Sequence, residues 1–273
     1  MKKILLISFS GGRTSAYMTY LILNGDLKEK YAQNYDAILP IFCNTSAEHT
    51  DTYRFIDDCV KHYGWSNFKV LQGIFYEHGK NDFVETTIHE CDKSGQTFLD
   101  AAKRYKGFSF LRACTRELKM GVFNKFIAKN FKACIVDRAI GIRADEPKRY
   151  KPKKGFIYPL IEDKPTFKSD VVDFFSDLDF DLKIPEYLGN CVYCYCKSES
   201  KLLKAIQETK NSDLFRKWIE ISKTNPQPQY RNYKRFEDFI KLEQCMPKID
   251  DLFAKNRFLG GCSESCEFHD LND

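Results

Sequence analysis

The first fifteen residues place the strongest constraint on the fold of this chain. An apolar run from Ile4 to Phe9 is typical of a buried parallel strand. It leads directly into a glycine- and hydroxyl-rich segment from Ser10 to Ser15, and an apolar helical pattern continues to Leu21. A strand, a glycine turn and a helix N-terminus in this order present unpaired backbone N–H groups to an anion. We therefore predict a phosphate-binding loop here, in preference to an ordinary turn that carries glycines.

Glycines let the backbone of this loop turn sharply and approach a phosphate closely, and hydroxyls add further donors. The residues expected to bind phosphate are Ser10, Gly11, Gly12, Arg13, Thr14 and Ser15. No Gly-Lys-Ser/Thr follows the glycines, so the loop is not a Walker A sequence. It also lacks the Gly-x-Gly-x-x-Gly fingerprint of dinucleotide-binding folds.

Length and charge limit the class of protein. A chain of 273 residues is long enough for one large domain, or for one domain with an appendage. The 43 basic and 38 acidic residues give a net charge of +5, which permits an anionic ligand without requiring nucleic acid. No apolar stretch reaches the length of a membrane span, and the first residues lack the features of a signal peptide. We expect a cytoplasmic protein with no membrane partner.

Strand and helix patterns alternate through the first 160 residues. Strands are expected at 36–43, 68–71 and within 133–142, and helices at 51–63 and 118–131. This alternation predicts an α/β fold, with a parallel sheet covered by helices and ligands at the carboxyl ends of the strands. We assign residues 1–160 to a nucleotide-binding domain.

Helical patterns dominate the rest of the chain. They are expected at 170–178, 199–208, 214–223 and 236–242, with cysteine clusters between them. We therefore predict a smaller, helical and cysteine-rich C-terminal region over residues 161–273.

A polar segment follows the second predicted strand. Asn44, Thr45 and Glu48 would lie beside the phosphate loop if both strands end at the same edge of the sheet. Such a sequence is also common in loops and helix caps, and the two interpretations are equally well supported here.

A second segment, around Cys114, begins the predicted helix at 118–131. Arg116 and Lys119 would project from the first turns, where positive charge opposes the helix dipole unless an anion is bound. A cysteine at a helix start is reactive as a thiolate or as a metal ligand. We expect a ligand here rather than a solvated basic helix.

A third segment places two arginines around two carboxylates after a predicted strand. It contains Gly141, Arg143, Asp145, Glu146 and Arg149. Arginine side chains bind phosphate or sulfate with two hydrogen bonds, and carboxylates can orient them or hold Mg²⁺. Its position favours a ligand role over surface ion pairs.

Together these segments resemble the phosphoadenylyl-sulfate (PAPS) reductase family of the adenine-nucleotide α-hydrolase-like, or PP-loop, superfamily. The matching strings are Ser-Gly-Gly-x-x-Ser, Asn-Thr-x-x-Glu, Cys-Thr-x-x-Leu-Lys and Gly-Ile-Arg-x-Asp-Glu-x-x-Arg, within residues 4 to 200. The resemblance implies a Rossmann-like fold with a mainly parallel five-stranded sheet. It also implies an adenine nucleotide (PAPS, adenylyl sulfate (APS) or ATP), with Arg143 and Arg149 on its phosphate or sulfate and Cys114 in sulfur or cluster chemistry.

The C-terminal tail departs from the classical sulfonucleotide reductases. Those proteins end in Glu-Cys-Gly-Leu/Ile-His, and the cysteine attacks the sulfur of the bound sulfate. Here Cys266 and His269 keep the spacing, but Ser265 and Glu267 replace the glutamate and the glycine. The resemblance makes Cys266 a candidate nucleophile beside Cys114.

Eleven cysteines in an expected reducing compartment indicate metal or thiol chemistry rather than disulfides. Cys191 and Cys194 have the Cys-x-x-Cys spacing that lets two thiolates meet one metal. With Cys262 and Cys266 they offer four thiolates for a [4Fe–4S] cluster or Zn²⁺, and the resemblance adds Cys114 as a fifth candidate. The alternative is a set of structural thiols without a ligand.

The other cysteines have a simpler interpretation. Cys43, Cys59 and Cys134 lie in apolar patterns and are expected to be small core residues, and Cys91 and Cys245 have no partner at ligand spacing. Cys196 is the weakest ligand candidate of its group.

Three functions fit these features. The first is a PAPS reductase-like oxidoreductase that binds an adenine nucleotide and requires a thiol reductant protein. The second is an ATP pyrophosphatase-type sulfur transferase that adenylates a nucleic acid, as in tRNA thiolation or DNA phosphorothioation. The basic stretch at 148–154 suits that substrate, although such a run is more often a solvated loop. The third is a nucleotide-binding protein without turnover, whose metal is structural.

Overall fold

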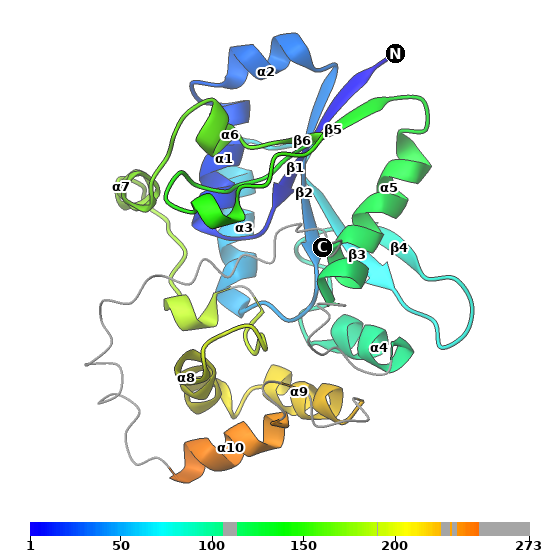
Figure 1. Ribbon diagram of the computed structural model, residues 1–273, viewed down its shortest axis with the longest axis vertical. Helices are drawn as coiled ribbons and strands as arrows, with labels where there is room; N and C mark the ends of the chain where they lie inside the picture. The colour runs from blue at the N-terminus through cyan, green and yellow to red at the C-terminus, as the bar shows by residue number, and fades with distance from the viewer. Residues whose placement is uncertain (106–113, 190, 225–229, 231–233, 246–273) are drawn as a thin grey trace.

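The computed structural model describes residues 1–105, 114–189, 191–224, 230 and 234–245. Within these ranges the chain forms one six-stranded sheet with helices packed on it (Figure 1). The strand order is β4-β3-β2-β1-β5-β6, and every neighbouring pair is parallel except β3 and β4. The predicted α/β class with a mainly parallel sheet is therefore confirmed.

The strands are β1 (Lys3–Phe9), β2 (Ala37–Asn44), β3 (Lys69–Ile74), β4 (Asp82–Thr86), β5 (Ile135–Ala139) and β6 (Phe156–Ile157). The described residues thus form six strands, where five are expected from the resemblance. The antiparallel β4 lies at an edge and is largely exposed, so it lacks the apolar run that marks the central strands. The β6 strand has only two residues, too few to give a sequence pattern.

The helices are α1 (Arg13–Leu23), α2 (Lys28–Asn34), α3 (Thr50–Tyr63), α4 (Gln96–Arg104), α5 (Val122–Asn130), α6 (Pro159–Glu162), α7 (Lys168–Ser176), α8 (Glu199–Thr209), α9 (Asp213–Lys223) and α10 (Phe236–Cys245). The predicted helix at 118–131 is divided into a π-helical segment, η1 (Thr115–Gly121), and α5. Two short 3₁₀ turns, η2 (Pro147–Arg149) and η3 (Glu186–Leu188), complete the set. None of the described helices has the length and apolar composition needed to cross a membrane.

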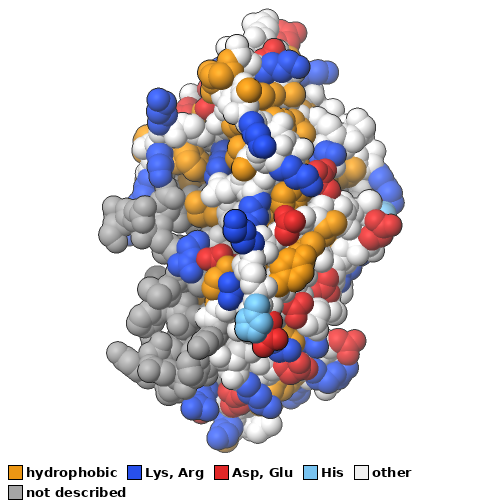
Figure 2. All heavy atoms as spheres, turned by 90° about the vertical axis from the view of Figure 1, so that its right-hand side faces the viewer, with side chains coloured by type: hydrophobic (Ala, Val, Ile, Leu, Met, Phe, Trp, Pro, Cys, Tyr) orange, Lys and Arg blue, Asp and Glu red, His pale blue; other side chains and the backbone are white. Residues whose placement is uncertain are grey.

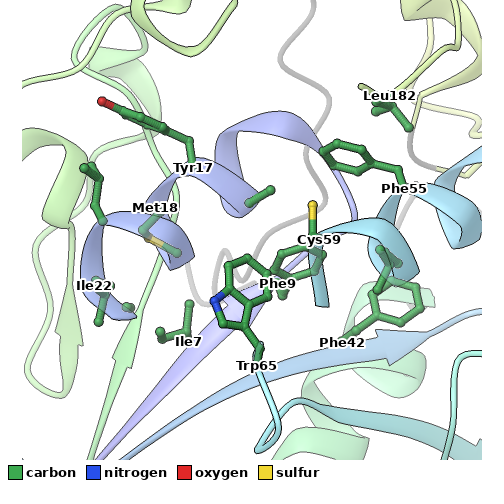
Figure 3. Close-up of a cluster of buried hydrophobic side chains, with 14 of the residues drawn as sticks. Ile7, Phe9, Tyr17, Met18, Ile22, Phe42, Phe55, Cys59, Trp65 and Leu182 are labelled. Carbon is green, nitrogen blue, oxygen red and sulfur yellow. The ribbon is translucent and has the colours of Figure 1, made fainter. Parts of the chain in front are cut away.

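One face of the sheet packs against α1, α3 and α7. Figure 3 shows Ile7 of β1 and Phe42 of β2 in one buried cluster with Met18 of α1 and Phe55 of α3. Phe175 of α7 belongs to the same buried cluster. Residues just beyond 160 therefore pack on the layer that carries the phosphate loop, and the domain division at that point stays a prediction.

The opposite face is covered by α5, and a separate helical layer lies near the carboxyl edge of the sheet. Phe123 and Phe126 of α5 are buried against this second face. In the helical layer, α4, α8, α9 and α10 surround Tyr193, whose side chain is completely buried beside Trp218 and Phe236. This layer carries the Cys-x-x-Cys segment.

Replacing Phe55 by alanine tests the contact between α3 and α7. The Phe55 ring is fully buried, with its centroid 5.3 Å from that of Phe175. The cavity and lost burial should lower the free energy of unfolding by about 3–5 kcal/mol in urea denaturation. Val172→Ala, at a side chain on α7 that is 47% exposed, serves as the control and should change it by less than about 0.5 kcal/mol. Equal effects of the two substitutions would contradict this packing.

Candidate functional site

The predicted phosphate loop connects the end of β1 to the start of α1. Gly11 has a φ of +82°, and a Cβ at this position would lie 2.7 Å from Cγ2 of Thr52 on α3. Both the left-handed conformation and the close approach require glycine. Gly12 then forms the extended N-cap of α1. The predicted order of strand, glycine turn and helix is confirmed.

Hydrogen bonds within the loop hold it in a closed shape. The Ser10 N–H donates to Ser15 Oγ at 3.1 Å, and that hydroxyl donates to the Gly12 carbonyl at 2.9 Å. Gly12 has no side chain to cap α1, and the first turn carries no acidic residue. The N–H groups of that turn, including those of Arg13 and Thr14, therefore meet the requirements of an anion site.

The Arg13 side chain has a structural role that the sequence does not predict. Its Nε and Nη2 donate to the two carboxylate oxygens of Asp181 at 2.6 and 2.7 Å, and Nη2 also donates to the Leu182 carbonyl. Arg54 of α3 donates to the Asp181 carbonyl at 2.6 Å. The guanidinium of Arg13 thus fixes the segment after α7 to the loop, and the predicted phosphate contact of this residue stays untested.

Of the two arginines after β5, Arg143 contacts the predicted phosphate loop. Arg143 Nη1 donates to the Thr14 hydroxyl at 3.1 Å, and its Nε donates to Asp145 at 2.8 Å. The buried carboxylate of Glu146 accepts from Arg149 at 2.7 Å and from the backbone N–H of Arg143 at 3.2 Å. The acidic residues therefore hold both arginines, and Arg143 is the one that meets the loop.

The chain reaches this position by passing close to α1 at Gly141. A Cβ at Gly141 would lie 3.5 Å from the Cα of Ser15, so the two backbones are in near contact. This approach brings the first and the third predicted segments into one site.

Asn44, at the end of β2, forms the centre of a buried hydrogen-bond network. Its Oδ1 accepts from the Ser46 N–H and the Tyr53 hydroxyl, each at 3.0 Å. Its amide group donates to Gln72 Oε1 at 3.0 Å and to the Asp92 carbonyl at 2.7 Å. With these positions used, the amide shapes the loop that follows β2, and the predicted contact between Asn44 and the nucleotide stays untested.

The same loop contains a buried carboxylate. Glu48 is 3% exposed and accepts from the Thr45 hydroxyl at 2.7 Å and from the Tyr53 hydroxyl at 3.2 Å. Burial, followed by the charge of Glu48, raises the pKa of Tyr53, so this phenol stays protonated and donates. Ser46 has a φ of +63° and accepts from the Phe98 N–H at 3.1 Å, which joins the loop to α4.

Three of the predicted ligand cysteines line a single pocket. They are Cys114, at the start of η1, and Cys191 and Cys194 of the Cys-x-x-Cys segment, and Cys196 is not part of the lining. Thr45 and Lys119 contribute polar groups to the same pocket. The structure therefore brings together cysteines that are 77 to 80 positions apart in the sequence.

The remaining walls of this pocket are mainly aromatic, and the sequence indicates only Tyr195 among them. Phe98 of α4, Trp218 of α9 and Tyr195 surround the thiols. The Tyr195 hydroxyl lies 3.9 Å from Cys114 Sγ, and burial, followed by the charge of Cys114, raises the pKa of this phenol. Only the position of Tyr195 between two cysteines signals its role in the sequence.

The Cys-x-x-Cys segment is attached directly to the loop after β2. The Val192 N–H donates to the Ala47 carbonyl at 2.9 Å, and Cys191 pairs with Glu48 in an isolated antiparallel bridge. The loop over residues 44–48 thus has the phosphate loop on one side, through the β1–β2 pairing, and the cysteines on the other.

Within the described ranges, no three His, Cys, Asp or Glu side chains are arranged to hold a metal ion. Cysteine thiolates are ligands that zinc and iron–sulfur clusters prefer, and three cysteines line one largely apolar pocket, so a bound metal or cluster here stays a prediction. The other two predicted ligands, Cys262 and Cys266, lie outside the described residues.

The two cations of the Cys114 segment occupy different surroundings. Lys119 lines the thiol pocket, whereas Arg116 is 53% exposed in its side chain and donates to its neighbour Glu117 at 2.6 Å. The two cations therefore do not share one environment, and the predicted ligand contacts of both stay untested.

The surface does not present a single basic field on the face drawn in Figure 2. There, lysines and arginines are interspersed with aspartates and glutamates. The predicted nucleic-acid partner therefore stays a prediction.

The fold and the site define an α/β protein with a candidate phosphate loop and a cysteine-lined pocket at one edge of its sheet. The chain is 33% identical to the uncharacterized nin region protein ORF290 of Escherichia phage lambda, over 96% of this chain and 94% of that protein. It belongs to the same family as that phage protein. No known family model matches the chain.

A search of solved structures matches the chain to the U34-tRNA thiolase NcsA from Methanococcus maripaludis, determined with its [4Fe–4S] cluster. The two chains are 14% identical, and the match covers 99% of this chain and 82% of that one. The TM-score is 0.39, which is too low to establish a shared fold.

Thiol labelling distinguishes the core cysteines from accessible ones. Burial raises the pKa of Cys43 to about 12 and that of Cys91 to about 11, so little reactive thiolate forms at pH 8. Iodoacetamide should modify both at least about 10-fold more slowly than the exposed Cys245, measured by peptide mass spectrometry. Labelling of Cys43 at the rate of Cys245 would contradict its burial.

Proposed function

We propose that this protein is an adenine-nucleotide-dependent enzyme of sulfur chemistry, of the PP-loop type. Its nucleotide is ATP, and its acceptor is a nucleic acid. The observation that carries the proposal is the loop at 44–48, which separates a phosphate loop from a cysteine-lined pocket at one sheet edge. Nucleotide activation and thiol chemistry can then act on one substrate placed between them.

The phosphate loop and the arginines supply the nucleotide half of the proposed reaction. Backbone N–H groups at the start of α1 bind the phosphates, and Arg143 beside Thr14 neutralises charge on the group that leaves. Glu146 keeps Arg143 and Arg149 in place, and Asp145 accepts from Arg143. An acceptor oxygen attacks the α-phosphate of ATP and forms an adenylated acceptor, with release of pyrophosphate.

The cysteine pocket supplies the sulfur half. A sulfide equivalent displaces AMP from the activated acceptor, and the original acceptor oxygen leaves with AMP. Cys114, Cys191 and Cys194 are the residues that would hold a [4Fe–4S] cluster or Zn²⁺, with Cys262 and Cys266 as further candidates from the sequence. A bound cluster would supply iron sites that bind sulfur, and zinc would supply a Lewis acid. Phe98 and Trp218 keep bulk water from the thiols.

The grouping of cysteines favours this reaction over sulfonucleotide reduction. Reduction of PAPS or APS requires one nucleophilic cysteine and an external thiol reductant, and the tail that would provide Cys266 departs from the reductase motif. Cysteines from two distant segments that share one pocket are better explained as ligands of one centre.

Substitution of Arg143 tests the nucleotide site. Arg143→Ala removes a charge-assisted contact beside the loop, and ATP affinity should fall about 10- to 100-fold by isothermal titration. Arg216→Ala removes an exposed arginine of α9 that pairs with Asp213, and it should leave the affinity unchanged. If both variants bound ATP as tightly as the wild type, Arg143 would have no place in this site.

Metal analysis of anaerobically purified protein tests the thiol centre. The wild type should contain iron with acid-labile sulfide, or one zinc, and the double variant Cys191→Ser/Cys194→Ser should lose it. Cys245→Ser is the matched control, because this exposed cysteine on α10 lies outside the pocket. Retention of the metal by the double variant would refute these two ligands.

A further inference from the structure

Lys197 is a lysine with no exposed surface, between the Cys-x-x-Cys segment and α8. Its ammonium group donates to the Val192 carbonyl at 2.9 Å and also to the Tyr187 carbonyl. Removing an ammonium group from water is costly unless strong hydrogen bonds replace its hydration. An apolar side chain of similar length would fill this space without that cost, so packing alone does not account for a lysine here.

The contacts of Lys197 are with the cysteine segment itself. Its Nζ bonds the carbonyl of Val192, inside the Cys-x-x-Cys sequence, and its backbone N–H donates to the Cys194 carbonyl at 3.0 Å. The Cys194 N–H in turn donates to the Cys191 carbonyl at 3.2 Å and closes the turn. One residue therefore fixes this turn at two points.

The peptide groups of Val192 are also held from the opposite side. The Val192 N–H bonds the Ala47 carbonyl in the loop after β2, while its own carbonyl accepts from Lys197. Val192 side-chain atoms are buried as well. The turn between the two cysteines is thus clamped between the sheet edge and a buried positive charge.

We propose that Lys197 is a positioning residue of the thiol centre. It holds the Cys191–Cys194 turn in the conformation in which both residues line the pocket with Cys114, and its positive charge offsets the negative charge of the metal-bound thiolates. This inference rests on the proposed metal centre, and it adds a residue outside the ligand set.

Cobalt titration of the full, metal-free and reduced chain tests the role of Lys197. Co²⁺ bound by thiolates gives a near-ultraviolet charge-transfer band, so affinity and thiolate ligation are read without any activity assay. Lys197→Met keeps the length of the side chain but removes both hydrogen bonds and the charge, and should weaken Co²⁺ binding about 10-fold or more. Lys197→Gln keeps an N–H donor without the charge and should lie between the wild type and Lys197→Met.

Lys201→Met is the matched control, because it makes the same chemical change at a nearby lysine of α8. The Lys201 ammonium pairs with the Glu186 carboxylate at 3.6 Å. It should bind Co²⁺ as the wild type does. ATP affinity should stay the same in all variants, since the phosphate loop is separate from Lys197.

The possible outcomes separate this inference from the proposed function. If the wild type shows the cobalt band and both Lys197 variants bind as tightly as Lys201→Met, the positioning role is refuted while the metal centre stands. If the wild type shows no band, the metal centre fails and the inference fails with it. If circular dichroism shows that Lys197→Met does not fold, the Co²⁺ affinity of Lys197→Gln is compared with that of Lys201→Met. Equal affinities would refute the positioning role.

Discussion

The hydrogen bonds of the Asn44 side chain are the interaction on which the candidate site depends. They connect the end of β2 to Ser46, Tyr53, Gln72 and the main chain of Asp92. These groups are at or near the carboxyl edge of the sheet, and each one left unsatisfied in a buried position would cost about 1–3 kcal/mol. The network therefore determines the direction in which the chain leaves the sheet.

The course of that loop brings the two candidate sites to one edge of the sheet. Parallel pairing of β1 with β2 places the phosphate loop beside the start of this loop, and the Ala47 carbonyl receives the Cys-x-x-Cys segment through Val192. The π-helical segment η1 starts directly after Cys114 and brings it into the same pocket. An irregular helix of this kind is common at functional sites, where a side chain must be redirected.

Local sequence patterns predicted the central strands and the first turn of the fold. They did not predict most of the contacts between residues far apart in the sequence. The apolar central strands and the Gly11 turn have strong local signatures, whereas the polar edge strand β4 has none. The position of Arg143 after a predicted strand was expected from the sequence, whereas its contact with Thr14 was not. The pairing of Arg13 with Asp181, 168 positions away, and the burial of Lys197 depend on tertiary packing that no periodicity records.

The central claim is that ATP is cleaved to activate an acceptor at this edge. The most direct measurement follows pyrophosphate, AMP and sulfite produced by anaerobically prepared protein. The account predicts pyrophosphate and AMP from ATP only when an acceptor nucleic acid (bulk tRNA or duplex DNA) and a sulfide source are present. Release of sulfite from PAPS or APS with a thiol reductant, and no pyrophosphate from ATP, would contradict it.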